Sequence, residues 1–157
     1  MTTPTPPAPT PTAALLERIA RQLVKDADPN AKTATVLAIT NATPRKRRTT
    51  TSIASGGDVY DVLDRAAALT PTEANAIAVT TCGWAAPTDD NDTAPSLHPE
   101  RQRVCLVSVH HIETGETVSA IRFTARPGIV TDHGQAHGTL ADAVTELGNE
   151  LRAKRTK

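Results

Sequence analysis

A β-hairpin is predicted in residues 104–123, which read Val104-Cys-Leu-Val-Ser-Val-His-His-Ile-Glu-Thr-Gly-Glu-Thr-Val-Ser-Ala-Ile-Arg-Phe123. Its first half is rich in apolar and β-branched residues, which favour strands. The tetrapeptide Glu113-Thr-Gly-Glu116 supplies turn residues, including a glycine that can take a positive φ. A returning strand is predicted over Thr117–Ala125. This part of the chain therefore predicts an antiparallel sheet.

Other strands are predicted on both sides of this hairpin. Ala76–Trp84 is apolar at successive positions, which is typical of a central strand covered on both faces. Thr35–Thr40 predicts an earlier strand, and the threonine run after it favours a second one over residues 48–54. A short edge strand is predicted at residues 129–131.

Three amphipathic helices accompany the strands. Leu16, Ile19 and Leu23 begin a stripe with the period of a helix, and Leu140–Leu151 carries the same pattern. A helix between the strands is predicted to begin at a capping box formed by Ser55 and Asp58. These elements indicate an α+β fold, with a mostly antiparallel sheet of about four to six strands and helices packed on one face.

Composition narrows the class of protein. The 157 residues carry 17 Lys and Arg against 17 Asp and Glu, and aromatic residues make up 2%. A neutral chain with so few rings lacks the stacked aromatics that bind single-stranded bases. Residues 1–12 form a Pro- and Thr-rich tail that we expect to be disordered, and residues 13–157 suit one domain. We expect no cofactor, no membrane contact and no signal peptide.

The two cysteines offer one weak catalytic candidate. Cys82 and Cys105 fall within apolar runs, which favours buried free thiols, since a disulfide would need adjacent strands. Cys82 stands near the end of its strand, where His98 from the following loop could supply positive charge. A core thiol is the favoured alternative to a nucleophile.

Histidines and an aspartate provide weak candidates for a metal site. Asp132, His133 and His137 lie close together in sequence, but the neighbouring glycines indicate a loop rather than a helix with ligands on one face. His110 and His111 end a strand, and successive strand side chains point to opposite faces. We therefore expect one of these two histidines to be exposed and the other to be packed.

Two segments are candidates for binding a partner. The single tryptophan precedes a long, proline-rich loop, and it either seals the core or anchors a partner. The candidate partner-binding residues are Trp84, Pro87, His98 and Arg101. A basic run could contact nucleic-acid phosphates or could be a solvated hairpin tip. That run consists of Arg45, Lys46, Arg47 and Arg48.

About half of the chain resembles small proteins of unknown function from actinobacteria and their phages. The resemblance lies in Cys82-Gly-Trp-Ala-Ala-Pro87, Ser96-Leu-His-Pro-Glu-Arg101 with Arg103-Val104, and Asp132-His-Gly-Gln-Ala-His-Gly-Thr-Leu-Ala-Asp-Ala143. It implies a cytoplasmic setting, in the host cell if a phage encodes the chain, and an accessory role. It brings no activity and no catalytic residues with it.

The main hypothesis is therefore a non-enzymatic accessory binding protein that docks on a protein or on nucleic-acid phosphates. The alternative is a small hydrolase or transferase. Its His/Asp site, with or without a metal, or its Cys site would lie between the loop after Trp84 and residues 131–138. A free sheet edge would also leave homodimer formation open.

Overall fold

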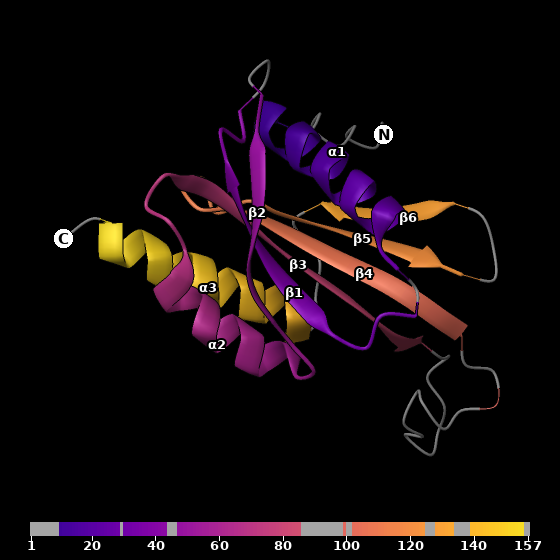
Figure 1. Ribbon diagram of the computed structural model, residues 1–157. Helices are drawn as coiled ribbons and strands as arrows, with labels where there is room; N and C mark the ends of the chain where they lie inside the picture. Colours follow the sequence, from indigo (N-terminus) through magenta and orange to yellow (C-terminus); the bar gives the residue numbers. More distant parts are fainter. Residues whose placement is uncertain are drawn as a thin grey trace, which may run out of the picture.

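The computed structural model describes residues 10–28, 30–43, 47–85, 99, 102–124, 128–133 and 139–155. The elements follow in the order α1 (Pro11–Asp26), β1 (Ala34–Thr40), β2 (Thr49–Gly56), α2 (Val59–Leu69), β3 (Ala74–Ala85), β4 (Gln102–His111), β5 (Thr117–Phe123), β6 (Ile129–His133) and α3 (Thr139–Arg155). In these ranges six strands form one open sheet in the order β2-β1-β3-β4-β5-β6, and every neighbouring pair is antiparallel (Figure 1). The predicted α+β class is confirmed.

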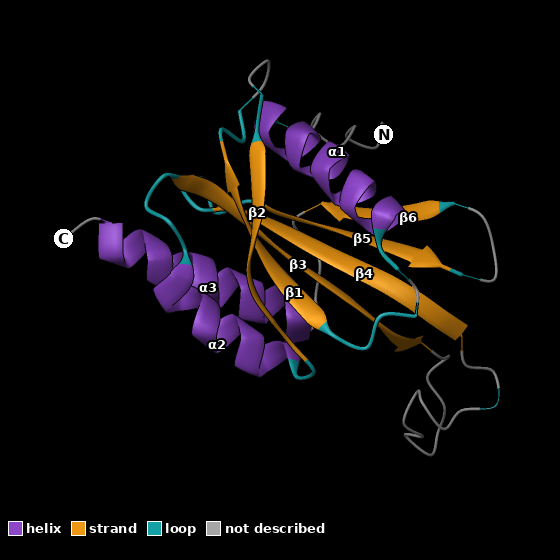
Figure 2. Ribbon diagram, in the orientation of Figure 1, coloured by secondary structure: helices purple, strands orange, loops and turns teal. Residues whose placement is uncertain are grey.

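Helices cover both faces of the sheet, so the expectation that they pack on one face is wrong (Figure 2). Helix α1 buries Leu16 and Ile19 against a face that includes Ala78 of β3. Helices α2 and α3 bury Val62 and Leu147 against the opposite face, which includes Ile77 and Val79 of β3. The physical reason is that the central strands are apolar at successive positions, and each apolar face must be removed from water.

The first two helices each begin at a side-chain cap, and the cap of the second differs from the prediction. The Oγ1 of Thr10 accepts a hydrogen bond from the backbone of Ala13 at 3.0 Å, so α1 begins at Pro11. Asp58 caps α2 alone, because β2 continues to Gly56 and Ser55 is still part of it. The Ser55 hydroxyl instead lies 3.3 Å from that of Thr35 across the β1–β2 ladder, so the predicted capping box is wrong.

The predicted hairpin between β4 and β5 is confirmed. Gly115 takes a φ of 78°, in the left-handed region that glycine adopts without strain. The backbone N–H of Gly115 donates to the carbonyl of His111 at 2.9 Å, and the N–H of His111 donates to the carbonyl of Glu116 at 2.9 Å. The turn sets the register in which His110 faces Thr117 and Ser108 faces Ser119. This register places several polar side chains beneath α3.

Candidate functional site

The predicted catalytic residues lie toward opposite ends of the sheet. Cys82 of β3 pairs with Cys105 of β4, whereas His133 of β6 pairs with Val118 of β5, which in turn pairs with Val109 of β4. The backbones of Cys82 and His133 are therefore separated by four residues along the strands and by three strands across the sheet. These separations correspond to about 13 Å and about 14 Å respectively. The structure does not bring the two positions together.

Several predicted site residues lie outside the described part of the chain. They are Arg45, Lys46, Pro87, His98, Arg101 and His137. Of the basic run, Arg47 and Arg48 are described, and both are exposed just before β2. Trp84 belongs to β3, and Asp132 belongs to β6. The roles proposed for these residues in partner, phosphate and metal binding stay predictions.

Two further tests concern metals and membranes. Within the described ranges, no three His, Cys, Asp or Glu residues are grouped so that they could hold a metal ion. No helix in the described ranges is both long enough and apolar enough to cross a lipid bilayer.

The thiol of Cys82 is not activated. It is half-buried, and burial raises its pKa to about 12, with the Sγ of Cys105 adding to the rise and the guanidinium groups of Arg103 and Arg122 opposing it. Since the thiolate is the nucleophile, a raised pKa leaves this cysteine almost entirely protonated near neutral pH. This setting favours the predicted core thiol over an activated catalytic nucleophile, and the catalytic role of Cys82 stays a prediction.

His110 and His111 are both buried, so the expectation that one of them is exposed is wrong. The reason is that α1 and α3 cover opposite faces of β4. The Nδ1 of His110 lies 2.8 Å from the Oγ1 of Thr117, while its Nε2 has no hydrogen-bond partner among the described residues. Burial first, and then the positive charge of Arg152, lowers the pKa of His110 to about 4. This histidine is a neutral core residue.

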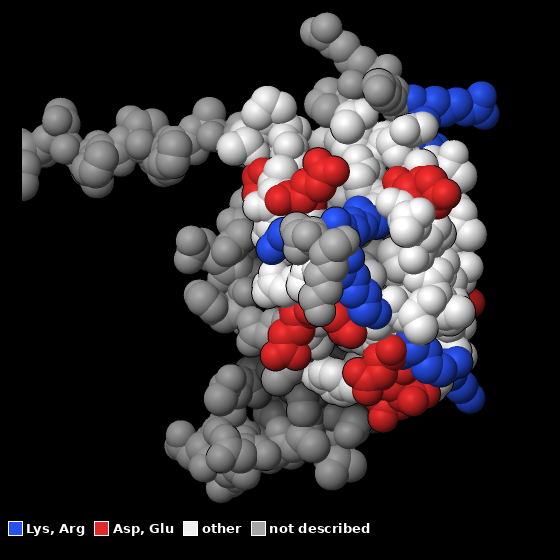
Figure 3. All heavy atoms as spheres, turned by 90° about the vertical axis from the view of Figure 1, so that its left-hand side faces the viewer, with Lys and Arg blue, Asp and Glu red and all other residues white. Residues whose placement is uncertain are grey.

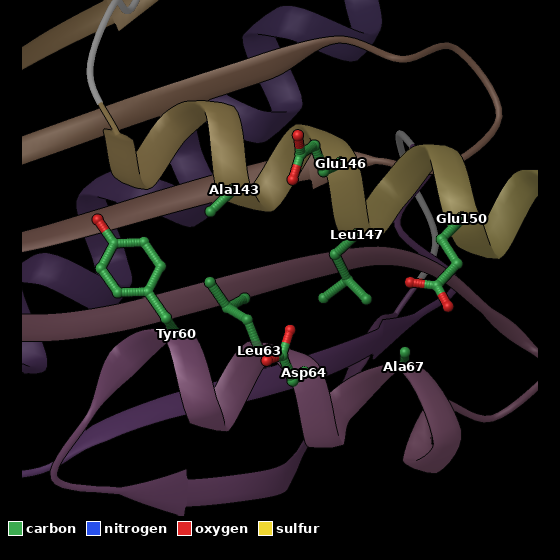
Figure 4. Close-up of a pocket in the computed structure, with 8 residues that line it drawn as sticks. All are labelled: Tyr60, Leu63, Asp64, Ala67, Ala143, Glu146, Leu147 and Glu150. Carbon is green, nitrogen blue, oxygen red and sulfur yellow. The ribbon is translucent and has the colours of Figure 1, made fainter.

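A groove lies between α2 and α3 in the described structure (Figure 4). Leu63 of α2 and Leu147 of α3 point toward one another and form its apolar floor. Tyr60 lies at one end of the groove beside Ala143, and Glu150 lies at the other end. The groove encloses about 270 Å³. It is lined by Tyr60, Leu63, Asp64, Ala67, Ala143, Glu146, Leu147 and Glu150.

The charged groups that line this groove all carry the same sign. Asp64, Glu146 and Glu150 are carboxylates, and no Lys, Arg or His is among the lining residues. Glu150 has a partner outside the lining, since the Nζ of Lys154 lies 3.8 Å from its Oε1. Figure 3 views the molecule from the side at which α2 and α3 end, and positive and negative groups lie next to one another on that face.

Sequence reasoning missed this groove. The helix pattern identified Leu63 and Leu147 only as members of two separate apolar stripes. One signal was present: Tyr60 is the only tyrosine of the chain, and it stands in the first turn of α2, where 48% of its surface is exposed. A large exposed ring beside acidic residues is typical of a binding surface.

Comparisons with known proteins add no relative. No protein-family model matches the chain, and neither the curated proteins nor the solved structures contain a significant match. The resemblance to small actinobacterial and phage proteins, together with the cytoplasmic setting that it implies, stays a prediction.

Proposed function

We propose that this chain is a non-enzymatic binding module that holds a short basic segment of a partner protein in the groove between α2 and α3. The observation that carries the proposal is the exposed ring of Tyr60 beside a rim of carboxylates, in a groove whose base is closed by the buried side chains of Leu63 and Leu147. An apolar side chain of the partner would pack against the ring of Tyr60. Flanking Lys or Arg side chains would then lie beside Asp64 and Glu146.

The size of the groove favours a peptide side chain over a small-molecule substrate. Its volume of about 270 Å³ falls below the range of roughly 300–1,000 Å³ that encloses drug-sized ligands. One or two side chains of an amphipathic segment fit such a space, as in helix-in-groove recognition. None of the lining residues is a Ser, Cys, Lys or His. A binding role therefore suits this groove better than nucleophilic catalysis.

Charge complementarity sets the expected preference. Charged groups across an interface raise the association rate and disfavour partners of the wrong sign. Exposed carboxylates remain solvated, so each contact with a Lys or Arg contributes little, about 0–1 kcal/mol. Since Leu63 and Leu147 are already buried in the fold, most of the affinity must come from covering the exposed ring of Tyr60. We expect weak binding that still discriminates between basic and acidic segments.

The proposal is tested with two synthetic peptides that share one central leucine. One peptide has Lys and Arg around the leucine, and the other has Asp and Glu at the same positions. Each is titrated into the ¹⁵N-labelled full chain, and backbone amide shifts are followed. The basic peptide should shift amides of α2 and α3 in a saturable manner, and the acidic peptide should not.

Charge reversal supplies the matched control. The double variant Asp64→Lys with Glu146→Lys should lose binding of the basic peptide, whereas Asp26→Lys should keep it, because Asp26 is exposed on α1 across the sheet. Binding of both peptides alike, or no shifts in α2 and α3, would contradict the proposal. Shifts confined to Arg47 and Arg48 on adding DNA instead of peptide would favour phosphate docking.

A further inference from the structure

The two cysteines of the chain lie directly opposite each other in the sheet. Cys82 of β3 and Cys105 of β4 are paired residues of an antiparallel ladder, and their Sγ atoms are 2.7 Å apart. Opposite residues in such a ladder have Cα atoms about 4.5–5.5 Å apart, which lies within the range that a disulfide spans. No backbone movement is needed to join them.

The two thiols differ in access to solvent. Cys105 is fully buried under α1, whereas Cys82 is only half-buried near the end of β3. A dissolved oxidant can therefore reach Cys82 first. The buried Sγ of Cys105 then lies next to it, and this is the arrangement of an attacking thiol and a resolving thiol.

The thiol of Cys82 has two acceptors within reach in the reduced pair. One is the carbonyl oxygen of Asp28, just beyond α1, at 3.2 Å from the Sγ of Cys82, and the other is the Sγ of Cys105. The Nη2 of Arg122 lies 3.9 Å from the Sγ of Cys105 and donates to it.

We propose that Cys82 and Cys105 form a reversible intrachain disulfide in exchange with a low-molecular-weight disulfide. The Cys82 thiolate attacks one sulfur of that disulfide, which gives a mixed disulfide at Cys82 and releases one small thiol. The Cys105 thiolate then attacks the Sγ of Cys82 and releases the second small thiol. The protein loses two electrons and two protons, and the small disulfide is reduced to two thiols.

Oxidation joins β3 to β4 covalently and removes the thiol donor from the carbonyl of Asp28. That carbonyl keeps its other bond, from the backbone N–H of Ala31 at 3.0 Å. Two carbonyls at the end of α1, those of Val24 and Ala27, also keep their bonds to the guanidinium of Arg122. The fold therefore survives in both states, and oxidation adds a covalent link between the paired strands β3 and β4.

The test uses the full chain, first reduced and then incubated with oxidised glutathione. After unfolding and alkylation, mass spectrometry should show a monomer that has lost two hydrogens and carries no alkyl group. Dithiothreitol should restore two alkylated cysteines. Since burial raises the pKa of Cys82, the rate should climb about tenfold for each unit of pH and show no plateau near the ordinary thiol pKa.

Single variants test the order of attack. Cys105→Ser should stop at a glutathione adduct on Cys82, and Cys82→Ser should leave Cys105 unmodified until the protein is unfolded. Two alkylated cysteines in wild-type protein after prolonged oxidation would overturn the proposal, as would disulfide-linked dimers in place of the monomer. The wild-type measurement decides the question even if a variant fails to fold, and it is independent of peptide binding in the groove.

Discussion

The imidazole of His110 packs against the backbone of Gly148, so that α3 approaches β4 closely at this point. A Cβ atom at position 148 would collide with the ring atoms Cδ2 and Nε2 of His110. The ring is fully buried, and its Nδ1 is held by Thr117. The ring therefore cannot easily move away from an added Cβ atom.

Gly148→Ala should destabilise the protein, although alanine favours a helix over glycine by about 1 kcal/mol. Overpacking a core costs typically about 1–3 kcal/mol, and the helix propensity of alanine offsets about 1 kcal/mol of this cost, so we expect the free energy of unfolding to fall by up to about 2 kcal/mol. Denaturation in urea measures it. In a His110→Ala background the same substitution should become neutral or stabilising. An equal effect in both backgrounds would contradict this packing.

The stability of the protein should decrease as the pH falls from about 6.5 to about 4. The pKa of His110 is near 6.5 in the unfolded chain and is lowered to about 4 by burial in the fold. Between these two pH values the unfolded state binds more protons than the folded state. The free energy of unfolding therefore decreases as the pH is lowered, and His110 contributes at most about 3 kcal/mol to this decrease. Above pH 6.5 the contribution is complete.

Urea denaturation across this pH range measures how the free energy of unfolding depends on pH. The variant His110→Asn is the control, because an amide does not titrate. Burial also lowers the pKa of His111, which Glu113 and Glu116 oppose, so some slope should remain in the variant. Carboxylates titrate in the same range and affect both proteins alike. Identical slopes in the two proteins would show that His110 is not the source.

Arg122 of β5 joins the sheet to the end of α1, and we expect its removal to loosen that end. Its Nε donates to the carbonyl of Val24 at 3.0 Å, and its Nη2 donates to that of Ala27 at 2.7 Å. A lysine has no planar fork and cannot reproduce both bonds. Arg122→Lys should therefore cost about 1–3 kcal/mol.

Hydrogen exchange distinguishes this role from a general loss of stability. Faster exchange in Arg122→Lys should be concentrated in the last turn of α1, with α3 on the opposite face less affected. Arg21→Lys is a matched control, because Arg21 is an exposed arginine on α1 itself that pairs with Glu17 at 3.4 Å. If amide hydrogen exchange changes in the same way in both variants, the bonds from Arg122 do not specifically stabilise the end of α1.

How much of this structure the sequence predicts depends on how local each feature is. The β4–β5 hairpin was predictable, because Gly115 and the strands beside it are contiguous. The sequence did not predict that Leu63 and Leu147 point toward one another, because this depends on how two helices far apart in the chain pack together. The pairing of Cys82 with Cys105 likewise depends on the register across a long connection. Helices on both faces were implied by the two apolar faces of β3, but the pattern does not say which helix covers which face.

Ser108 and Ser119 form a buried pair across β4 and β5, with their hydroxyl oxygens 2.7 Å apart. Either single change to alanine should destabilise the protein by about 1–3 kcal/mol, because it leaves one buried hydroxyl without its partner. The double change removes both hydroxyls and should cost less than the two single changes combined. A double-mutant cycle from urea denaturation measures the difference. Additive costs would show that the two hydroxyls do not stabilise each other, and that another group satisfies each of them.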